Sequence, residues 1–238
     1  MARKKLRPTP QLPFSFEAKR SYARADFVPG DSNAAGLTLI DAWPEWPARV
    51  CAIWGPKGSG KTHLARIWQS QAQAISIEPL ALHDNIVAGL SAGGAFLIDG
   101  ADHVRDGKAF FHLINFVQQS QGWLLMTGVE APPRWPAQVP DLHSRLTAVP
   151  GAGLQMPDEP LLARALLKLF ADRQLKLPEE VLNSLVPRLE RSFADAERLV
   201  ALIDGLALQQ KRNISVEIAN FALRHLDEAE GRSGADTE

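Results

Sequence analysis

The chain has 238 residues, of which 45% are hydrophobic and 22% are charged, so it can bury the core of one large domain or of a large and a small domain. Its formal net charge of -1 argues against a protein whose main task is to grip duplex DNA, because such domains are usually strongly basic. The single cysteine, Cys51, excludes a disulfide framework and fits a reducing, cytoplasmic environment.

Residues 1–26 are rich in proline and basic side chains and show no sustained periodicity, which is typical of a flexible arm. Prolines follow the basic start in place of an apolar core, so we do not expect a signal peptide, and no stretch approaches the length of a membrane span. The arm contains one apolar cluster, formed by Gln11, Leu12, Pro13, Phe14, Ser15 and Phe16. Taken alone, such a cluster more often packs on its own domain than on a partner.

From residue 27 onward, short apolar runs alternate with helical patterns. Strands are expected at residues 49–54, 74–77, 95–99 and 123–127, with a fifth somewhere in 146–156. This alternation predicts an α/β fold in which helices flank a parallel sheet. After residue 157 every pattern is helical. We therefore expect a flexible arm over residues 1–26, an α/β domain over 27–157, and a small helical domain with a polar tail over 158–238.

A phosphate-binding loop lies directly after the first expected strand. It has the form G-x-x-x-x-G-K-[ST] and consists of Gly55, Pro56, Lys57, Gly58, Ser59, Gly60, Lys61 and Thr62. Its glycines let backbone N–H groups point at phosphate oxygens, Lys61 supplies a positive charge, and the Thr62 hydroxyl can complete a Mg²⁺ shell. The backbone N–H of His63 can add to this cradle. The motif predicts that the chain binds ADP or ATP with Mg²⁺.

The third expected strand ends in Asp99, which is where a phosphate-loop protein needs an acid to orient the metal ion. Asp99 would hold Mg²⁺, directly or through water, opposite Thr62. ATPases of this build usually place a second acid immediately afterwards to orient the attacking water, and this chain has Gly100 there. Its own hydrolysis should therefore be slow, unless Asp102 reaches the site.

Two further residues are candidates for a role in catalysis. Thr127 ends the fourth expected strand, where a hydroxyl can sense the terminal phosphate, although strand propensity alone would also explain a threonine there. Arg145 follows at a position from which an arginine can project into a neighbouring subunit's nucleotide. Such an arginine finger stabilises transition-state charge and accelerates the reaction on the order of 10³–10⁵-fold.

Taken in order, these segments resemble the AAA+ module of the bacterial replication initiator DnaA. The resemblance covers roughly residues 25–226 and rests on residues 27–33, the phosphate loop, the strands ending in Asp99 and Thr127, and residues 142–145. It implies a P-loop NTPase domain followed by a helical lid, with Phe27 and Val28 beside the nucleotide. The arm's apolar cluster looks like the clamp-binding hexapeptide of the shorter DnaA-related regulators, the Hda family, and the chain ends where the initiator's DNA-binding domain would begin.

The resemblance implies negative regulation of chromosomal replication initiation. The residues that it assigns to binding of the DNA polymerase sliding clamp are Gln11, Leu12, Pro13, Phe14 and Phe16. Arg145 would act in trans to stimulate ATP hydrolysis on DnaA, while the chain's own nucleotide, ADP on this model, would be structural. DNA would be contacted only through the clamp, and nucleotide-dependent self-association is compatible with this model.

The lid departs from the DnaA pattern at one position. DnaA-type lids place a sensor arginine at the start of the third lid helix, where this chain has Ala194, with Arg191 and Arg198 as nearby substitutes. We expect Ser192 and Asp195 to cap that helix.

Two other functions share the same core. An AAA+ loader of the replicative helicase would act near origins as well, but such loaders normally carry a larger partner-binding region ahead of the core. A self-sufficient ATPase motor is disfavoured by Gly100.

Overall fold

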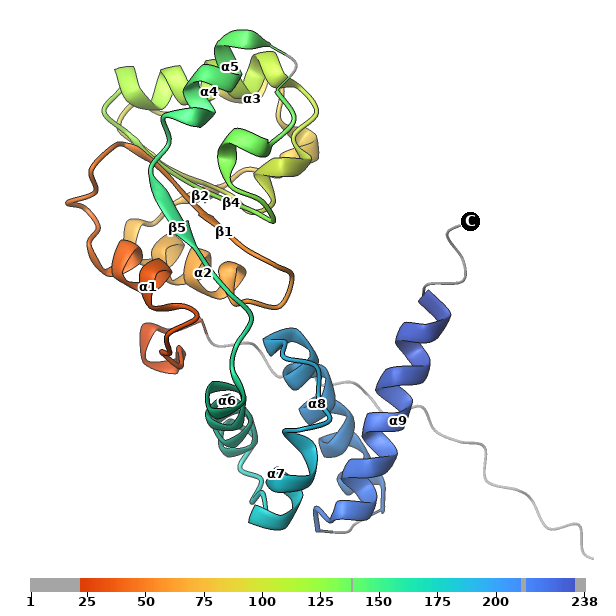
Figure 1. The fold of residues 1–238 in the computed structure, drawn as a ribbon. Coiled ribbons are helices and arrows are strands. Elements are labelled where there is room, and N and C mark those ends of the chain that lie inside the picture. The colour runs from red at the N-terminus through yellow and green to blue at the C-terminus, as the bar shows by residue number, and fades with distance from the viewer. Residues whose placement is uncertain (1–21, 138, 211–212, 234–238) are drawn as a thin grey trace, which may run out of the picture.

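The computed structural model describes residues 22–137, 139–210 and 213–233. Figure 1 shows an α/β unit followed along the chain by a group of helices. The apolar cluster of the arm, residues 11–16, lies outside the described residues. Among the helices of the described part, none is long and apolar enough to cross a membrane.

Five parallel strands form one sheet in the order β2-β3-β4-β1-β5. The strands are β1 (Val50–Trp54), β2 (Ile75–Ser76), β3 (Ala95–Ile98), β4 (Trp123–Gly128) and β5 (Gly151–Gly153). The five expected strands are confirmed, with small differences at their ends. Because the strands run in the same direction, the loops that follow the neighbouring strands β3, β4 and β1 meet at one edge of the sheet.

Helices cover both faces of the sheet (Figure 1). They are α1 (Ala34–Asp41) and α2 (Lys61–Ala72) on one face, and α3 (Asp84–Ala88), α4 (Gly107–Gln119) and α5 (Pro140–Thr147) on the other. Strand β1 serves both cores, since Cys51 and Ile53 pack with α1 and α2 while Val50 and Ala52 pack with α4 and α5. A fully covered parallel strand needs apolar residues on both faces, which explains the continuous apolar run in its sequence.

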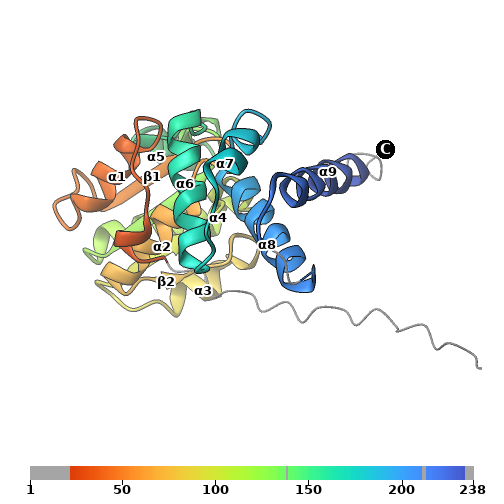
Figure 2. The ribbon, with the colours of Figure 1, turned by 90° about the horizontal axis from the view of Figure 1, so that it is seen from below.

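Four helices follow the sheet and share a core of their own. They are α6 (Glu159–Asp172), α7 (Glu179–Leu185), α8 (Phe193–Gln210) and α9 (Val216–Ser233), and Figure 2 shows α9 on the side of the molecule away from α1. The expected cap is present, because the Ser192 hydroxyl accepts a hydrogen bond from the Asp195 N–H at 3.3 Å. The sheet and these helices confirm the predicted fold class, whereas the domain boundaries at 26 and 157 stay predictions.

Short 3-10 helices occupy several loops. They are η1 (Arg24–Asp26), η2 (Pro79–Ala81), η3 (Ala101–His103) and η4 (Pro132–Arg134). Because η2, η3 and η4 come after β2, β3 and β4, they lie on the side of the sheet to which the carboxyl ends of the strands point.

A tryptophan cluster at the opposite edge anchors the helix that follows the phosphate loop. Trp68 of α2 stacks on Trp46 with 5.2 Å between ring centroids, and Trp46 meets the ring of Trp123 edge-on at 5.9 Å. The guanidinium of Arg49 lies 4.1 Å above the Trp123 ring. Stacked and edge-on aromatic pairs add to the burial energy of such a cluster. The far end of α2 is thereby fixed against the sheet, which helps to position its first turn at the phosphate loop.

Candidate nucleotide-binding site

The phosphate loop connects β1 to α2, as its motif predicts. Gly58 and Gly60 have φ angles of 81° and 97°, in the left-handed region that favours glycine. Gly60 caps α2 with no side-chain hydrogen bond, so the N–H groups of the first turn remain available to an anion. The Ser59 hydroxyl is fully buried and has no hydrogen-bond partner among the described residues.

Lys61 is the first residue of α2, and its ammonium group reaches back across the loop. It donates to the carbonyl oxygens of Gly55 at 2.7 Å and of Pro56 at 2.8 Å. Burial lowers the pKa of Lys61, and the negative charges of Asp99 and Asp102 act in the opposite direction. The ammonium group is therefore held against the loop backbone by two hydrogen bonds.

The predicted acid and sensor positions lie together at the ends of β3 and β4 (residues Asp99 and Thr127). The Thr127 hydroxyl donates to Asp99 Oδ1 at 2.5 Å and accepts from the Gly100 N–H at 2.9 Å. Thr127 is 1% exposed, so these two bonds fix its hydroxyl and orient the carboxylate. This juxtaposition follows from the pairing of the two strands, in which Ile98 lies opposite Met126.

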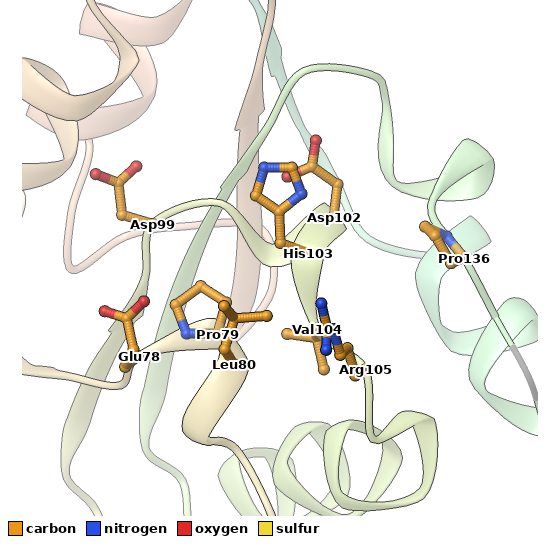
Figure 3. Close-up of a pocket in the computed structure, with 9 residues that line it drawn as sticks. All are labelled: Glu78, Pro79, Leu80, Asp99, Asp102, His103, Val104, Arg105 and Pro136. Atoms are coloured by element: carbon orange, nitrogen blue, oxygen red, sulfur yellow. The ribbon is translucent and has the colours of Figure 1, made fainter. Parts of the chain in front are cut away.

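Asp102 lies on η3, beyond the turn made at Gly100, where φ is 87°. Its Oδ2 accepts a hydrogen bond from the Val129 N–H at 2.8 Å. Asp99 and Asp102 both line an open pocket of about 510 Å³. Figure 3 shows the residues around it, and the remaining ones are Glu78, Pro79, Leu80, His103, Val104, Arg105 and Pro136. The pocket at this sheet edge therefore contains three carboxylates, those of Glu78, Asp99 and Asp102.

The segment before α1 packs against the start of α2. The His63 ring lies edge-on between Phe27, at 5.3 Å between centroids, and Tyr22, at 5.5 Å. Burial lowers the pKa of His63 and thereby favours its neutral form. His63 thus contributes a packed side chain, and a role of its backbone N–H at the phosphates stays a prediction.

Sequence reasoning missed Asn33 as a residue that shapes this segment. Asn33 is fully buried, its Oδ1 accepts from the Gly30 N–H at 2.9 Å, and its Nδ2 donates to the Val28 carbonyl at 3.0 Å. These bonds fix the backbone around Val28, which the resemblance places beside the nucleotide. An asparagine within a run of proline, glycine, aspartate and serine is a signal for such a loop.

Arg145 lies in the last turn of α5 and not in a loop. It is exposed, and within the described part of the chain its side chain makes no hydrogen bond or ion pair. Helix α5 packs against α4 and η4, on the sheet face opposite α2. The structure therefore does not bring Arg145 together with α2, which carries Lys61 of the phosphate loop.

The four helices that follow the sheet, α6 to α9, form the lid. The lid contacts the phosphate loop through the start of α8. The Phe193 N–H donates to the Gly58 carbonyl at 2.9 Å. Ala194 follows and is exposed, while Arg191 pairs with Glu159 at 2.8 Å and Arg198 hydrogen-bonds the Asp195 carboxylate. Both candidate substitutes for the sensor arginine are thus engaged by carboxylates of the lid.

These residues fit the phosphate groups of a nucleotide together with Mg²⁺. The loop offers a buried unpartnered hydroxyl, uncapped N–H groups and the Lys61 ammonium, while Thr62 and Asp99 are oxygen donors of the kind that Mg²⁺ prefers. Among the described residues, no group of three or more His, Cys, Asp or Glu side chains could hold a metal ion by itself. A magnesium ion here would therefore take its remaining ligands from phosphate oxygens or water.

Sequence comparison finds curated relatives of this chain. It is 23% identical over 261 aligned residues to the chromosomal replication initiator DnaA of Corynebacterium jeikeium, a match that covers 94% of this chain and 44% of that protein. It is 29% identical over 178 residues to an uncharacterised protein of Haemophilus influenzae, covering 69% of this chain and 77% of that one. The chain thus spans less than half the length of this DnaA relative. No family model matches the chain.

Comparison with solved structures identifies the fold. Domain III of DnaA from Thermotoga maritima superposes with a TM-score of 0.73 at 20% identity, covering 86% of this chain and 96% of that one. The chain has the AAA+ fold. AMPPCP-bound DnaA from Aquifex aeolicus gives a TM-score of 0.65 at 18% identity over 80% of this chain and 68% of that one. The branch migration motor RuvB of Thermotoga maritima gives 0.66 at 18% identity, over 86% and 72%, so the fold alone does not select a function.

Proposed function

We propose that this protein is a nucleotide-bound negative regulator of chromosomal replication initiation that stimulates ATP hydrolysis on DnaA. The observation that carries the proposal is a complete phosphate loop beside a paired Asp99 and Thr127, combined with Gly100 in place of the second acid. A site built in this way favours holding a nucleotide over hydrolysing it quickly. The similarity to DnaA in sequence and fold supports a role in replication.

In this chain's own site, the residues divide the work of holding a nucleotide. The Lys61 ammonium would exchange its bonds to the loop carbonyls for bonds to phosphate oxygens, and the N–H groups at the start of α2 would donate hydrogen bonds to those oxygens. Thr62 and Asp99 would hold Mg²⁺, which neutralises phosphate charge when bound. Thr127 would keep the Asp99 carboxylate oriented through their hydrogen bond. On the model that the family resemblance implies, the nucleotide held in this way would be ADP, which would give the protein its working shape.

Arg145 would act on the nucleotide of DnaA and not on this chain's own. Its exposure and its lack of an ion pair within the described residues leave the guanidinium available to a partner. Its helix packs on the sheet face opposite α2, which separates it from the helix that carries Lys61 of this chain's own phosphate loop. A guanidinium that reaches the transferred phosphoryl group in trans accelerates hydrolysis on the order of 10³–10⁵-fold.

The arm would bring the protein to replicating DNA. Gln11 offers an amide for hydrogen bonds, and Leu12, Phe14 and Phe16 offer apolar anchors for a pocket on the sliding clamp. This part of the proposal rests on the sequence resemblance alone.

The first prediction concerns Arg145→Ala. Single-turnover hydrolysis of ATP prebound to DnaA is measured with this protein, ADP and DNA-loaded clamp. We expect wild-type protein to accelerate hydrolysis strongly, and Arg145→Ala to lose most of that acceleration while keeping nucleotide and clamp binding, because only the trans guanidinium is removed.

The matched control is Arg224→Ala, which removes an exposed arginine from α9 and should leave stimulation unchanged. Full stimulation by Arg145→Ala contradicts the finger assignment. If the wild-type protein gives no stimulation with the clamp bound and co-purifies with the replicative helicase, the chain is better described as a helicase loader.

A further inference from the structure

Asp102 is a second carboxylate at the sheet edge, in a place that the motifs do not specify. It follows the strand-ending Asp99 by three positions and belongs to η3. The left-handed backbone at Gly100 turns the chain there, because a φ of 87° redirects the segment that leaves β3. Gly100 therefore occupies the position of the usual second acid, and it also makes the turn that leads to Asp102 on η3.

The Asp102 carboxylate is fixed at one oxygen and open at the other. Oδ2 accepts the Val129 N–H at 2.8 Å, and no hydrogen bond among the described residues engages Oδ1. Val129 directly follows β4, two residues after Thr127, so this bond ties η3 to the strand that carries the sensor hydroxyl. The bond holds the carboxylate beside Thr127 and Asp99 at the edge of the sheet.

Asp102 is also linked to the start of the phosphate loop through Val129, whose N–H it accepts and whose carbonyl accepts the Gly55 N–H at 3.1 Å. It lines the same pocket as Asp99, and Figure 3 shows the two carboxylates with the His103 ring between them in this view. Burial lowers the pKa of Lys61, and the negative charges of Asp99 and Asp102 both act to raise it. Glu78 lines the pocket as well, but it is exposed and lies directly before η2.

We propose that Asp102 is the carboxylate that orients and deprotonates water for a slow ATP hydrolysis in this chain's own site, in place of the acid missing at Gly100. The inference rests on the nucleotide binding proposed above. The water oxygen forms a bond to the γ-phosphorus, the bond from that phosphorus to the bridging oxygen of ADP breaks, and the water proton passes to Asp102. The products are ADP and inorganic phosphate. This reaction would return the regulator to its ADP-bound form without help from another protein.

The test compares wild-type protein with Asp102→Asn in single-turnover hydrolysis of labelled ATP, with protein in excess. Asparagine can still accept the Val129 N–H through its amide oxygen, so the loop is preserved while the base is lost. We expect the wild type to convert bound ATP faster than free ATP hydrolyses, and the variant to be slower by about 100-fold or more, as for removal of a general base. The dissociation constants for fluorescent ATP and ADP analogues and the urea unfolding midpoint should stay close to wild type.

Asp106→Asn is the matched control, because Asp106 also accepts a backbone N–H, that of Ala109 at 2.9 Å, but only caps α4. It should turn over ATP like the wild type. Unchanged turnover in Asp102→Asn, loss of turnover in Glu78→Gln alone, or the absence of turnover in wild-type protein that has bound ATP each overturns the inference but leaves the proposed function intact. A wild-type chain that binds no nucleotide contradicts the proposed function itself.

Discussion

Gly58 meets two requirements at a single backbone position. Its φ of 81° lies where a side chain is strained, and a Cβ added there would lie 2.1 Å from the Ser192 hydroxyl oxygen and 2.9 Å from the Ser192 Cβ. Its carbonyl also accepts the Phe193 N–H. The motif explains the first requirement through phosphate binding, but the second comes from the lid and is visible only in the folded chain.

Gly58→Ala should therefore destabilise the protein and weaken nucleotide binding. The left-handed backbone alone costs a non-glycine residue about 1–2 kcal/mol, and the contact with Ser192 adds to this cost. Urea unfolding and titration with a fluorescent nucleotide measure the two effects. Gly205→Ala is the control: Gly205 lies within α8 with nothing within 4 Å of an added Cβ, so it should stabilise the helix by up to about 1 kcal/mol. If Gly58→Ala has the stability and nucleotide affinity of the wild type, the lid and the loop can accommodate the added methyl group without loss of free energy, and the prediction is wrong.

At the scale of elements, β1 connects the two cores to the phosphate loop. It pairs with β4 on one side and β5 on the other, and its side chains pack into both cores. The Cys51 thiol is fully buried in this strand and lies 3.7 Å from the Ala48 carbonyl. Burial raises the pKa of the thiol to about 12, so almost no thiolate forms in the folded protein near neutral pH.

Cys51 should consequently report the opening of β1. Because it is the single cysteine of the chain, alkylation by iodoacetamide at pH 8 should be nearly absent in the native protein and should modify one thiol per chain in urea. Mass spectrometry measures the modified fraction. Ser91→Cys, at an exposed loop position, should react at once in the native state and so confirm that the reagent is active. Rapid native alkylation of Cys51 would mean that the central strand opens readily.

At the scale of the whole molecule, the helical lid is joined to the sheet unit at several points. Besides the bond between Phe193 and Gly58, Lys168 of α6 donates to Asp26 of η1 at 2.8 Å and to Asp172 at 2.9 Å. Burial lowers the pKa of Lys168, but the hydrogen bonds to Asp26 and Asp172 outweigh it, so that the pKa is raised overall. The contact to Asp26 bridges segments 142 positions apart, and it couples the lid to the segment that precedes α1.

A double-mutant cycle of Lys168→Met and Asp26→Asn should give a favourable coupling of about 0.5–1 kcal/mol in urea unfolding, since both side chains are partly exposed. The pKa of Lys168 is raised in the folded protein. The coupling between Lys168 and Asp26 should therefore be complete below the ordinary lysine pKa of about 10.4, and it should disappear as the pH rises through the folded-state pKa of Lys168. The exposed pair of Arg134 and Glu130, within one loop, serves as the control and should couple by at most about 0.5 kcal/mol. Coupling that persists above the folded pKa would contradict the ionic origin.

Much of the fold was predictable because its determinants are local. Apolar runs of strand length alternating with helical patterns predicted the parallel sheet, and the change of pattern after residue 157 predicted the helices that follow. The phosphate loop was equally plain, because its chemistry requires fixed residue types at fixed spacing. Asp99 and Thr127 could be named as strand-end residues, and Ser192 as a cap, for the same reason.

The tertiary structure decided how residues distant in sequence combine. The order of the strands brings the Thr127 hydroxyl to Asp99, the turn at Gly100 brings Asp102 to the same edge, and lid packing puts Phe193 on Gly58. It also revealed the buried Asn33 beside Val28 and the helical setting of Arg145. None of these follows from local pattern, because hydrogen bonds across a sheet and contacts between domains depend on topology and on which backbone groups remain to be satisfied once the chain is folded.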